Sequence, residues 1–431
     1  MGTDKRYRAV ASRLPDTDVR RTVMDNGVRV LTDSVDSATS ATFAVWVGVG
    51  GRDEALPVSG SSHFLEHLLF KGTPTRSALD IALEIDGVGG DLNAYTSSEH
   101  TAYFARVPAS ESELALDVLL DVVAEPTLDG EDLEGERDVI LSELASAEDD
   151  PEDLASVKLF EALFPDHALG RDVLGTESSV SAITRDDVAE FYRRWYQPSN
   201  LVVTGAGNVD HDELVDEVAR RFGHLNAAGV PERVTPDAGI VSEVFEERPV
   251  EMVQLAFGWR ATAAGSPDRY ALSVLNHILG TGPSSRLFQH VREERGLTYS
   301  IVSSVAHYSD VGAFSVQCGT APSNAAEVIE VIRTDIDLIS TQGVTADELA
   351  RAKRAIRGGL LLGLEDTSAR GARLGVSEVL RGFVTPIDDH LRLLDAVTLD
   401  DVLRVTQAVF TGDSALVAVG PGNLATVLSG R

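Results

Sequence analysis

The chain has 431 residues, of which 43% are hydrophobic and 24% charged, and its formal net charge is −31. This length predicts more than one hydrophobic core, and the composition is that of a globular protein rather than a disordered or fibrous one. The negative charge disfavours nucleic acids and anionic membranes as partners and favours cationic ligands such as basic peptides, although it also serves solubility alone.

Targeting signals and disulfide bonds are not expected. Residues 1–21 mix basic and acidic side chains and have no apolar core, which excludes a secretory signal and a transit peptide. Apolar runs such as 42–49 and 201–206 are as long as β-strands and too short to cross a bilayer. The single cysteine, Cys318, is predicted to be packed in a strand and excludes a thiolate-rich zinc cluster. We therefore expect a cytoplasmic protein.

The first motif with chemical content lies at residues 61–70, where the apolar spacing predicts a helix with Ser61 or Ser62 as its cap. His63 and His67 are four residues apart, so both imidazoles project about 6 Å apart on one face and can reach one ion. Glu66 flanks such an ion without binding it and is placed to move a proton between water and a leaving amine. Taken alone, this inverted His-x-x-Glu-His motif also fits a helix with two incidental histidines.

A third ligand is expected further along the chain, because a catalytic zinc takes three protein ligands and keeps a fourth position open. Residues 129–150 predict a long helix that is rich in glutamate, and most acids on such a helix face solvent. Glu136 and Glu143 are two turns apart and lie beside Val139 and Ile140, so this pair is the best placed to point inward.

The chain is interpreted as a duplication. Residues 200–209 and 415–424 each read as an apolar strand followed by a Gly-x-Gly-Asn turn, and the preceding segments 184–188 and 398–402 also correspond. The alternation of strands and helices predicts two α+β sandwich domains, each with an antiparallel-rich sheet covered by helices.

The boundary between the copies is predicted near residue 235, within a linker rich in Ala, Gly and Pro, which gives an N-terminal domain of residues 1–235 and a C-terminal domain of residues 236–431. In the alignment of the two copies, Glu136 and Glu143 fall opposite Ala352 and Gly359. Such a difference is expected if only the first copy is catalytic.

Residues 62–73, 92–96 and 136–140 together resemble the pitrilysin–insulysin family of metallopeptidases, and within it the half-length branch related to the mitochondrial processing peptidase. The resemblance extends through residues 284–299 and covers nearly the whole chain. It implies a zinc-dependent endopeptidase that cleaves peptides or unfolded segments in an enclosed chamber. The residues carried over are His63, His67 and Glu143 as ligands of one Zn²⁺ per chain, Glu66 as general base, and Glu136 as the acid that orients a ligand.

The resemblance also implies substrate-binding residues. Residues 91–96 and 101–106 predict a hairpin, and the family pattern makes its strand at Asn93 and Ala94 an exposed edge on which the peptide lies. Arg292 and Tyr299 would pass for surface residues by themselves, whereas the resemblance places them at the oxyanion of the scissile carbonyl. Half-length relatives pair, so we expect a homodimer in which these two residues serve the partner's zinc, with a heterodimer as the other option.

Two other functions stay open on the sequence alone. One is a non-catalytic or regulatory subunit that pairs with an active peptidase, although the metal motif is intact. The other is a structural zinc protein, which would need a fourth protein ligand. Residues 280–286 lack the ending of a phosphate loop and predict only a loop before a helix. For an enzyme with this charge, basic residues near the cleaved bond are the expected preference.

Overall fold

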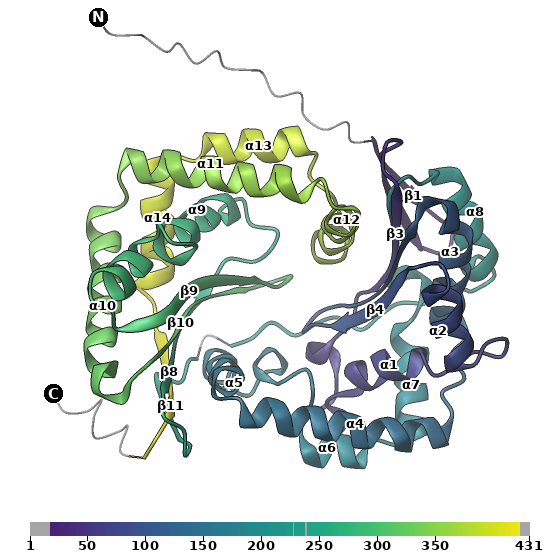
Figure 1. Cartoon of the computed structure of the whole chain (residues 1–431), viewed down its shortest axis with the longest axis horizontal. Helices are drawn as coiled ribbons and strands as arrows, with labels where there is room; N and C mark the ends of the chain where they lie inside the picture. The colour runs from purple at the N-terminus through teal and green to yellow at the C-terminus, as the bar shows by residue number, and fades with distance from the viewer. Residues whose placement is uncertain (1–17, 227, 238, 423–431) are drawn as a thin grey trace, which may run out of the picture.

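The computed structural model describes residues 18–226, 228–237 and 239–422, and its elements form two helix-covered β-sheets (Figure 1). The predicted fold class, α+β with two sheet-and-helix units, is confirmed by this architecture. Residues 1–17, and Asn423 and Leu424 of the second repeat, lie outside the described residues. Within the described residues, no helix is both long and apolar enough to span a membrane.

The first sheet has six strands in the order β1-β2-β6-β3-β5-β4, and its neighbours are antiparallel except for the parallel pair β2 and β6. The turn at residues 24–28, which carries the sequence Asp-Asn-Gly, joins the first two strands as a hairpin. β4 is the last strand in this order. The strands are β1 (Asp18–Val23), β2 (Arg29–Ser34), β3 (Ser40–Val47), β4 (Asp91–Thr96), β5 (Thr101–Pro108) and β6 (Leu201–Gly207).

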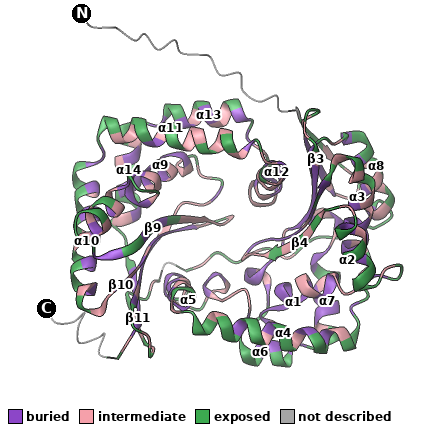
Figure 2. Cartoon of the chain, viewed as in Figure 1, coloured by how far each residue is buried: buried purple, intermediate pink, exposed green. Residues whose placement is uncertain are grey.

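The helices of the first half follow from amphipathic stretches, several of which begin at an Asp, Ser or Thr cap. Their bounds are α1 (Ser61–Leu69), α2 (Ala78–Asp86), α3 (Ser112–Ala124), α4 (Gly130–Asp149), α5 (Pro151–Leu163), α6 (Glu177–Ala182), α7 (Arg185–Trp195) and α8 (His211–Phe222). Figure 2 shows that buried residues gather along the strands and on the helix faces turned toward them.

The second sheet has five strands in the order β7-β11-β8-β10-β9, and β11 pairs in parallel with β7. Its strands are β7 (Glu243–Glu247), β8 (Val253–Ala261), β9 (Thr298–His307), β10 (Gly312–Thr320) and β11 (Ser414–Gly420). The helices are α9 (Arg269–Gly280), a π-helical segment (Phe288–Glu293), α10 (Ala325–Gln342), α11 (Ala346–Gly363), α12 (Thr367–Arg381), α13 (Ile387–Ala396) and α14 (Leu399–Phe410).

Corresponding helices in the two halves begin in the same way. Thr184 caps α7 and Thr398 caps α14, and each threonine forms a reciprocal capping box with an aspartate three residues later. Both helices lead into the strand that carries the Gly-x-Gly repeat, β6 in the first half and β11 in the second. The matching caps agree with an origin of the chain by duplication.

Each half contributes one helix to the sheet of the other half (Figure 1). α5 packs on β8 and β11, where Leu159 and Leu163 lie against Gly258 of the second sheet. α12 packs on β3 and β6, where Gly375 lies so close to Trp46 that no Cβ would fit. The exchange buries apolar surface between the halves and therefore opposes their separation.

A buried ion cluster also joins the two halves. Arg52 donates to Glu99 at 2.6 Å and, through both ends of its guanidinium, to Asp310 at 2.7 and 2.6 Å. Glu99 lies in the turn between β4 and β5, and its carboxylate also accepts the backbone N–H of Ser309 at 2.7 Å. The predicted boundary near residue 235 falls beside this cluster, because Arg52 also donates to the carbonyl of Val234 at 2.6 Å.

Candidate metal centre and active site

Helix α1 is held at its N-terminus by a distant carboxylate. Gly60 is the residue before the first turn, and Glu54 accepts the backbone N–H groups of Gly60 and Ser62, each at 2.6 Å. The expectation that Ser61 or Ser62 caps the helix was therefore wrong, because the buried Glu54 already takes the free N–H groups. Burial raises the pKa of Glu54 to about 7, although both N–H donors favour its ionised form.

The histidines of α1 face a glutamate of α4. The rings of His63 and His67 have their centroids 4.8 Å apart, and Glu143 Oε2 lies 3.6 Å from His63 Nε2 and 3.7 Å from His67 Nε2. The three side chains each offer one ligand atom, and these atoms all lie within 4.8 Å of one another. The three residues that the sequence proposed as metal ligands are thus brought together, although Glu143 follows His67 by 76 positions.

These donors fit a zinc ion. Bonds of about 2.0–2.2 Å in a tetrahedral arrangement place neighbouring ligand atoms about 3.4 Å apart, close to the two distances between Glu143 and the histidines. Burial and, to a smaller degree, His67 lower the pKa of His63 to about 4, so its imidazole is neutral near pH 7, as a metal ligand must be. Two neutral imidazoles and one carboxylate are a donor set that zinc prefers.

Glu136 supports the second histidine from one helical face of α4. Its Oε2 lies 2.9 Å from His67 Nδ1, and its other oxygen accepts the ammonium group of Lys71. Burial acts to raise the pKa of Glu136, but the hydrogen bonds of Lys71 and His67 outweigh it, and the pKa lies below its ordinary value. An ionised Glu136 fixes His67 Nδ1 as the protonated nitrogen and leaves Nε2 free to bind a metal.

Glu66 lies on α1 between the histidines and β4. Thr96 Oγ1 donates to Glu66 Oε2 at 2.6 Å, which holds the carboxylate by one oxygen and leaves the other to accept a proton. Burial raises the pKa of Glu66, while the Thr96 hydrogen bond and His67 lower it. In the sequence, Thr96 stands out only as the end of the strand motif, and Lys71 has no predicted role, although it follows His67 by four positions.

The predicted substrate strand lies at the edge of the first sheet. β4 pairs with β5 on one side, and among the described residues no strand pairs with its other side. Asn93 and Ala94 lie in the middle of β4, opposite Phe104 and Tyr103. Thr96 ends the same strand, so a peptide added along this edge would run toward the residue that holds Glu66.

Arg292 and Tyr299 are brought together in the second half. The Arg292 guanidinium lies 5.0 Å from the centroid of the Tyr299 ring, and it also lies 4.6 Å from the centroid of the Phe288 ring. The arginine belongs to the π-helical segment, and the tyrosine is the second residue of β9. The hydrogen bonds, ion pairs and ring contacts that the described structure gives these two residues stay within the second half, and Tyr299 is 83% exposed.

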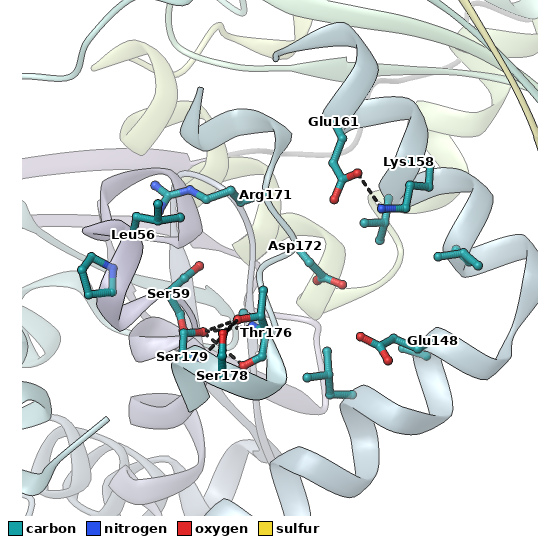
Figure 3. Close-up of a pocket in the computed structure, with 16 residues that line it drawn as sticks. Leu56, Ser59, Glu148, Lys158, Glu161, Arg171, Asp172, Thr176, Ser178 and Ser179 are labelled. Carbon is teal, nitrogen blue, oxygen red and sulfur yellow. Dashed lines mark hydrogen bonds and ion pairs between the residues drawn. The ribbon is translucent and has the colours of Figure 1, made fainter. Parts of the chain in front are cut away.

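A cavity of about 710 Å³ lies beyond Glu143 along α4, between α4, α5 and the loop that carries Asp172 (Figure 3). Its charged lining residues are the acids Glu148, Glu161 and Asp172 and the bases Lys158 and Arg171, and Lys158 is paired with Glu161 at 2.8 Å. Burial raises the pKa of Asp172; a hydrogen bond from Leu174 opposes this rise, and nearby carboxylates, Glu148 and Glu161 among them, add to it. The three carboxylates outnumber the two basic side chains that line the cavity. We call it the acidic pocket.

Comparison with known proteins places the chain in a family. Residues 29–177 match the model of insulinase, peptidase family M16, and residues 182–356 match the model of the peptidase M16 inactive domain. The histidine motif and Glu143 lie in the first matched region. The name 'inactive domain' belongs to the second matched region, residues 182–356, which does not contain that motif.

Similar proteins cover nearly the whole chain. A Mycobacterium tuberculosis protein described as an uncharacterized zinc protease is 44% identical over 93% of this chain and 93% of its own length. A Bacillus subtilis protein with the same description is 34% identical over 94% of this chain and 99% of its own length. The crystal structure of a protease from Helicobacter pylori shares the fold with a TM-score of 0.88 at 22% identity, covering 94% of this chain and all of that one. The chain belongs to the insulinase family of peptidases, family M16, which confirms the predicted resemblance.

Proposed function

We propose that this chain is a zinc-dependent endopeptidase that cleaves peptides or unfolded segments. The observation that carries the proposal is the convergence of His63, His67 and Glu143, whose ligand atoms lie within 4.8 Å of one another. The names of the relatives, which are described as zinc proteases, support the same metal. A zinc ion held by these residues, one per chain, supplies Lewis acidity that polarises a peptide carbonyl and makes a bound water more acidic.

The protein groups would divide the chemistry as follows. Glu66 takes the proton of the attacking water on its free oxygen, since Thr96 occupies the other, and returns the proton to the leaving amine. The β4 edge at Asn93 and Ala94 binds the peptide through main-chain hydrogen bonds, which are indifferent to side-chain identity. Arg292 and Tyr299 donate to the carbonyl oxygen as negative charge develops on it.

The ion pair and ring contacts that the described residues give Arg292 and Tyr299 stay within the second half, and we propose that the two residues act on a partner's zinc site within a homodimer. The 83% exposure of Tyr299 supports a role at a surface that another copy covers. Each dimer would then hold two composite sites, each built from the zinc-binding half of one copy and the Arg/Tyr pair of the other.

The proposed function is tested by chelation. The purified chain is incubated with a quenched fluorescent peptide, its zinc content is measured, and the metal is removed with a chelator and then returned. We expect hydrolysis to fall to background on chelation and to return at about one zinc per chain. Hydrolysis that survives complete zinc removal would exclude the proposal, and zinc binding without hydrolysis unless a second protein is added would favour a non-catalytic subunit.

The acidic pocket supports a preference for basic side chains near the cleaved bond. A lysine or arginine side chain that entered this pocket would meet the carboxylates of Glu148 and Asp172, and it would share Glu161 with Lys158. We expect peptides with Arg or Lys near the scissile bond to have a kcat/KM up to about tenfold above that of their Gln analogues. The variant Glu148→Gln combined with Glu161→Gln should remove most of this difference.

Glu131→Gln is the matched control, because Glu131 is an exposed acid in the first turn of the same helix α4 and lies outside the acidic pocket. It changes the overall charge in the same direction without changing the pocket. A cleavage profile that ignores Arg and Lys in the unmodified chain, or an equal loss of preference in the Glu131→Gln control, would contradict a role of the pocket.

A further inference from the structure

A second cavity, of about 270 Å³, lies in the second half between α11, α12, α13, the end of β9 and the loop that leads into α9. None of its twelve lining residues is acidic, although acidic residues outnumber lysine and arginine by 68 to 37 in the chain. We call it the cationic pocket. The basic residues that line it are Arg269, Arg373, Arg381, His307 and His390.

Two of these arginines have only neutral partners. Arg269 donates to the carbonyl of Ser266 at 3.0 Å and to the Tyr270 hydroxyl at 2.9 Å. Arg381 donates to the Ser377 hydroxyl at 2.6 Å and lies over the ring of Phe383. Among the described residues, neither guanidinium forms an ion pair. Two guanidinium groups without an ionic partner in one cavity need an explanation, because like charges repel and their burial is costly.

The third arginine is partly unsatisfied. One end of the Arg373 guanidinium donates to the carbonyl of Thr385 at 3.2 Å, and Nη2 lies 3.5 Å from Asp33, which also accepts Arg370 at 3.0 Å. Arg373 Nε and Nη2 are shielded from solvent and have no hydrogen-bond partner in the described structure, and the same holds for the Thr385 hydroxyl. Such groups cost stability unless an acceptor reaches them.

The pKa values of the two histidines are lowered by the arginines of the cationic pocket. Burial lowers the pKa of His307, and the charges of Arg269 and Arg381 lower it further. A hydrogen bond with the Thr262 carbonyl acts in the opposite direction and raises this pKa. Burial also lowers the pKa of His390, and Arg269, Arg373 and Arg381 lower it further. The positive charge of the cationic pocket therefore acts on both rings, and Asp33 pairs with only one of the three arginines, Arg373.

We propose that the cationic pocket binds a phosphate-class oxyanion, either free phosphate or diphosphate or the phosphate groups of a nucleotide. Guanidinium groups match the oxygens of phosphate with pairs of parallel N–H donors. Arg269 approaches the cavity from α9, and Arg373 and Arg381 approach it from α12. The bound anion would join α12, which covers the first sheet, to α9 and α13 of the second half. Binding should therefore also raise the melting temperature.

The test is calorimetric titration of the full chain with inorganic diphosphate, with phosphate and with ATP, each against chloride at equal ionic strength. We expect one diphosphate per chain and, for Arg269→Gln combined with Arg381→Gln, at least about tenfold weaker binding. The single variant Arg381→Gln should lose an intermediate amount. Arg392→Gln is the matched control, because Arg392 is a 69% exposed arginine of α13 outside the cavity.

The outcomes separate the sources of the anion. Equal affinity for diphosphate and ATP indicates recognition of the phosphates alone, whereas tighter binding of ATP indicates a nucleotide. Because diphosphate also binds zinc, the arginine variants, whose zinc-binding residues are unchanged, show where it binds. No saturable binding, or binding that is equally strong in the double variant and in Arg392→Gln, would overturn the proposal. Melting curves of each variant without ligand identify any that fails to fold.

Discussion

Replacing Glu66 by glutamine is expected to leave zinc bound and to lower kcat by about 10³-fold or more. The carboxylate lies on the metal helix but is not one of the three residues that converge as ligands, so its charge is needed for proton transfer and not for binding the metal. Glutamine keeps the size of the side chain and an acceptor for Thr96, but it cannot take a proton from water. The measurements are zinc content by elemental analysis and steady-state cleavage of a quenched peptide.

The contrast with Glu143→Gln makes the result specific. Glu143 is a candidate ligand, so its substitution should lower both zinc content and activity, and added zinc should restore part of the activity. In Glu66→Gln, added zinc should restore nothing. Turnover that stays within a few-fold of the unmodified chain would remove Glu66 from the mechanism, and a chain that has lost its zinc would make Glu66 a structural residue of the centre.

The local part of the site followed from the sequence because helical geometry is strict. A spacing of four residues places two side chains on the same face of a helix, and the rings of His63 and His67 do lie side by side. Glu136 and Glu143 were selected by the same rule, seven residues apart on α4, and the comparison with the second copy then distinguished them from the solvent-facing acids. The catalytic roles of these residues stay predictions.

The contacts that hold the site could not be predicted in the same way. Glu54 reaches the start of α1 from a loop, and Thr96 reaches Glu66 from the edge of a sheet 30 residues later. The contact of Glu54 with the start of α1 and the contact of Thr96 with Glu66 do not follow the periodicity of a helix or a strand. They arise from the way the chain packs, which a sequence pattern does not show. Lys71 could have been noticed, because it follows His67 by four positions, which is the spacing of neighbours on one face of a helix. However, α1 ends at Leu69, and the apolar periodicity gave no reason to continue the helix to Lys71.

The fold was predictable as a class and not in its connections. Alternating strands and helices predicted two helix-covered sheets, and two such sheets are present. That α5 covers the second sheet and α12 the first was not foreseen, because an apolar helix face indicates that a helix is buried without indicating against which sheet. The small residues Gly258 and Gly375, which allow these close contacts, acquire their meaning only in the folded chain.

A heterodimer of two inactive chains is expected to recover activity if the sites are composite. One chain carries Glu66→Gln, and the other carries Arg292→Ala with Tyr299→Phe. Each homodimer has two damaged sites. A heterodimer purified through two different tags has one site in which both changes meet and one in which neither occurs, so it should show about half the turnover of the unmodified dimer.

This expectation separates three arrangements. If Arg292 and Tyr299 served the zinc site of their own chain, both sites of the heterodimer would be damaged and it would be as inactive as its parents. If the pair had no role, the Arg292→Ala with Tyr299→Phe homodimer would be active by itself. A fully active monomer in light scattering would exclude the pairing altogether. Recovery to about half can arise only when the zinc-binding residues of one copy and the Arg/Tyr pair of the other form one site, an arrangement that we propose and that the exposure of Tyr299 would permit.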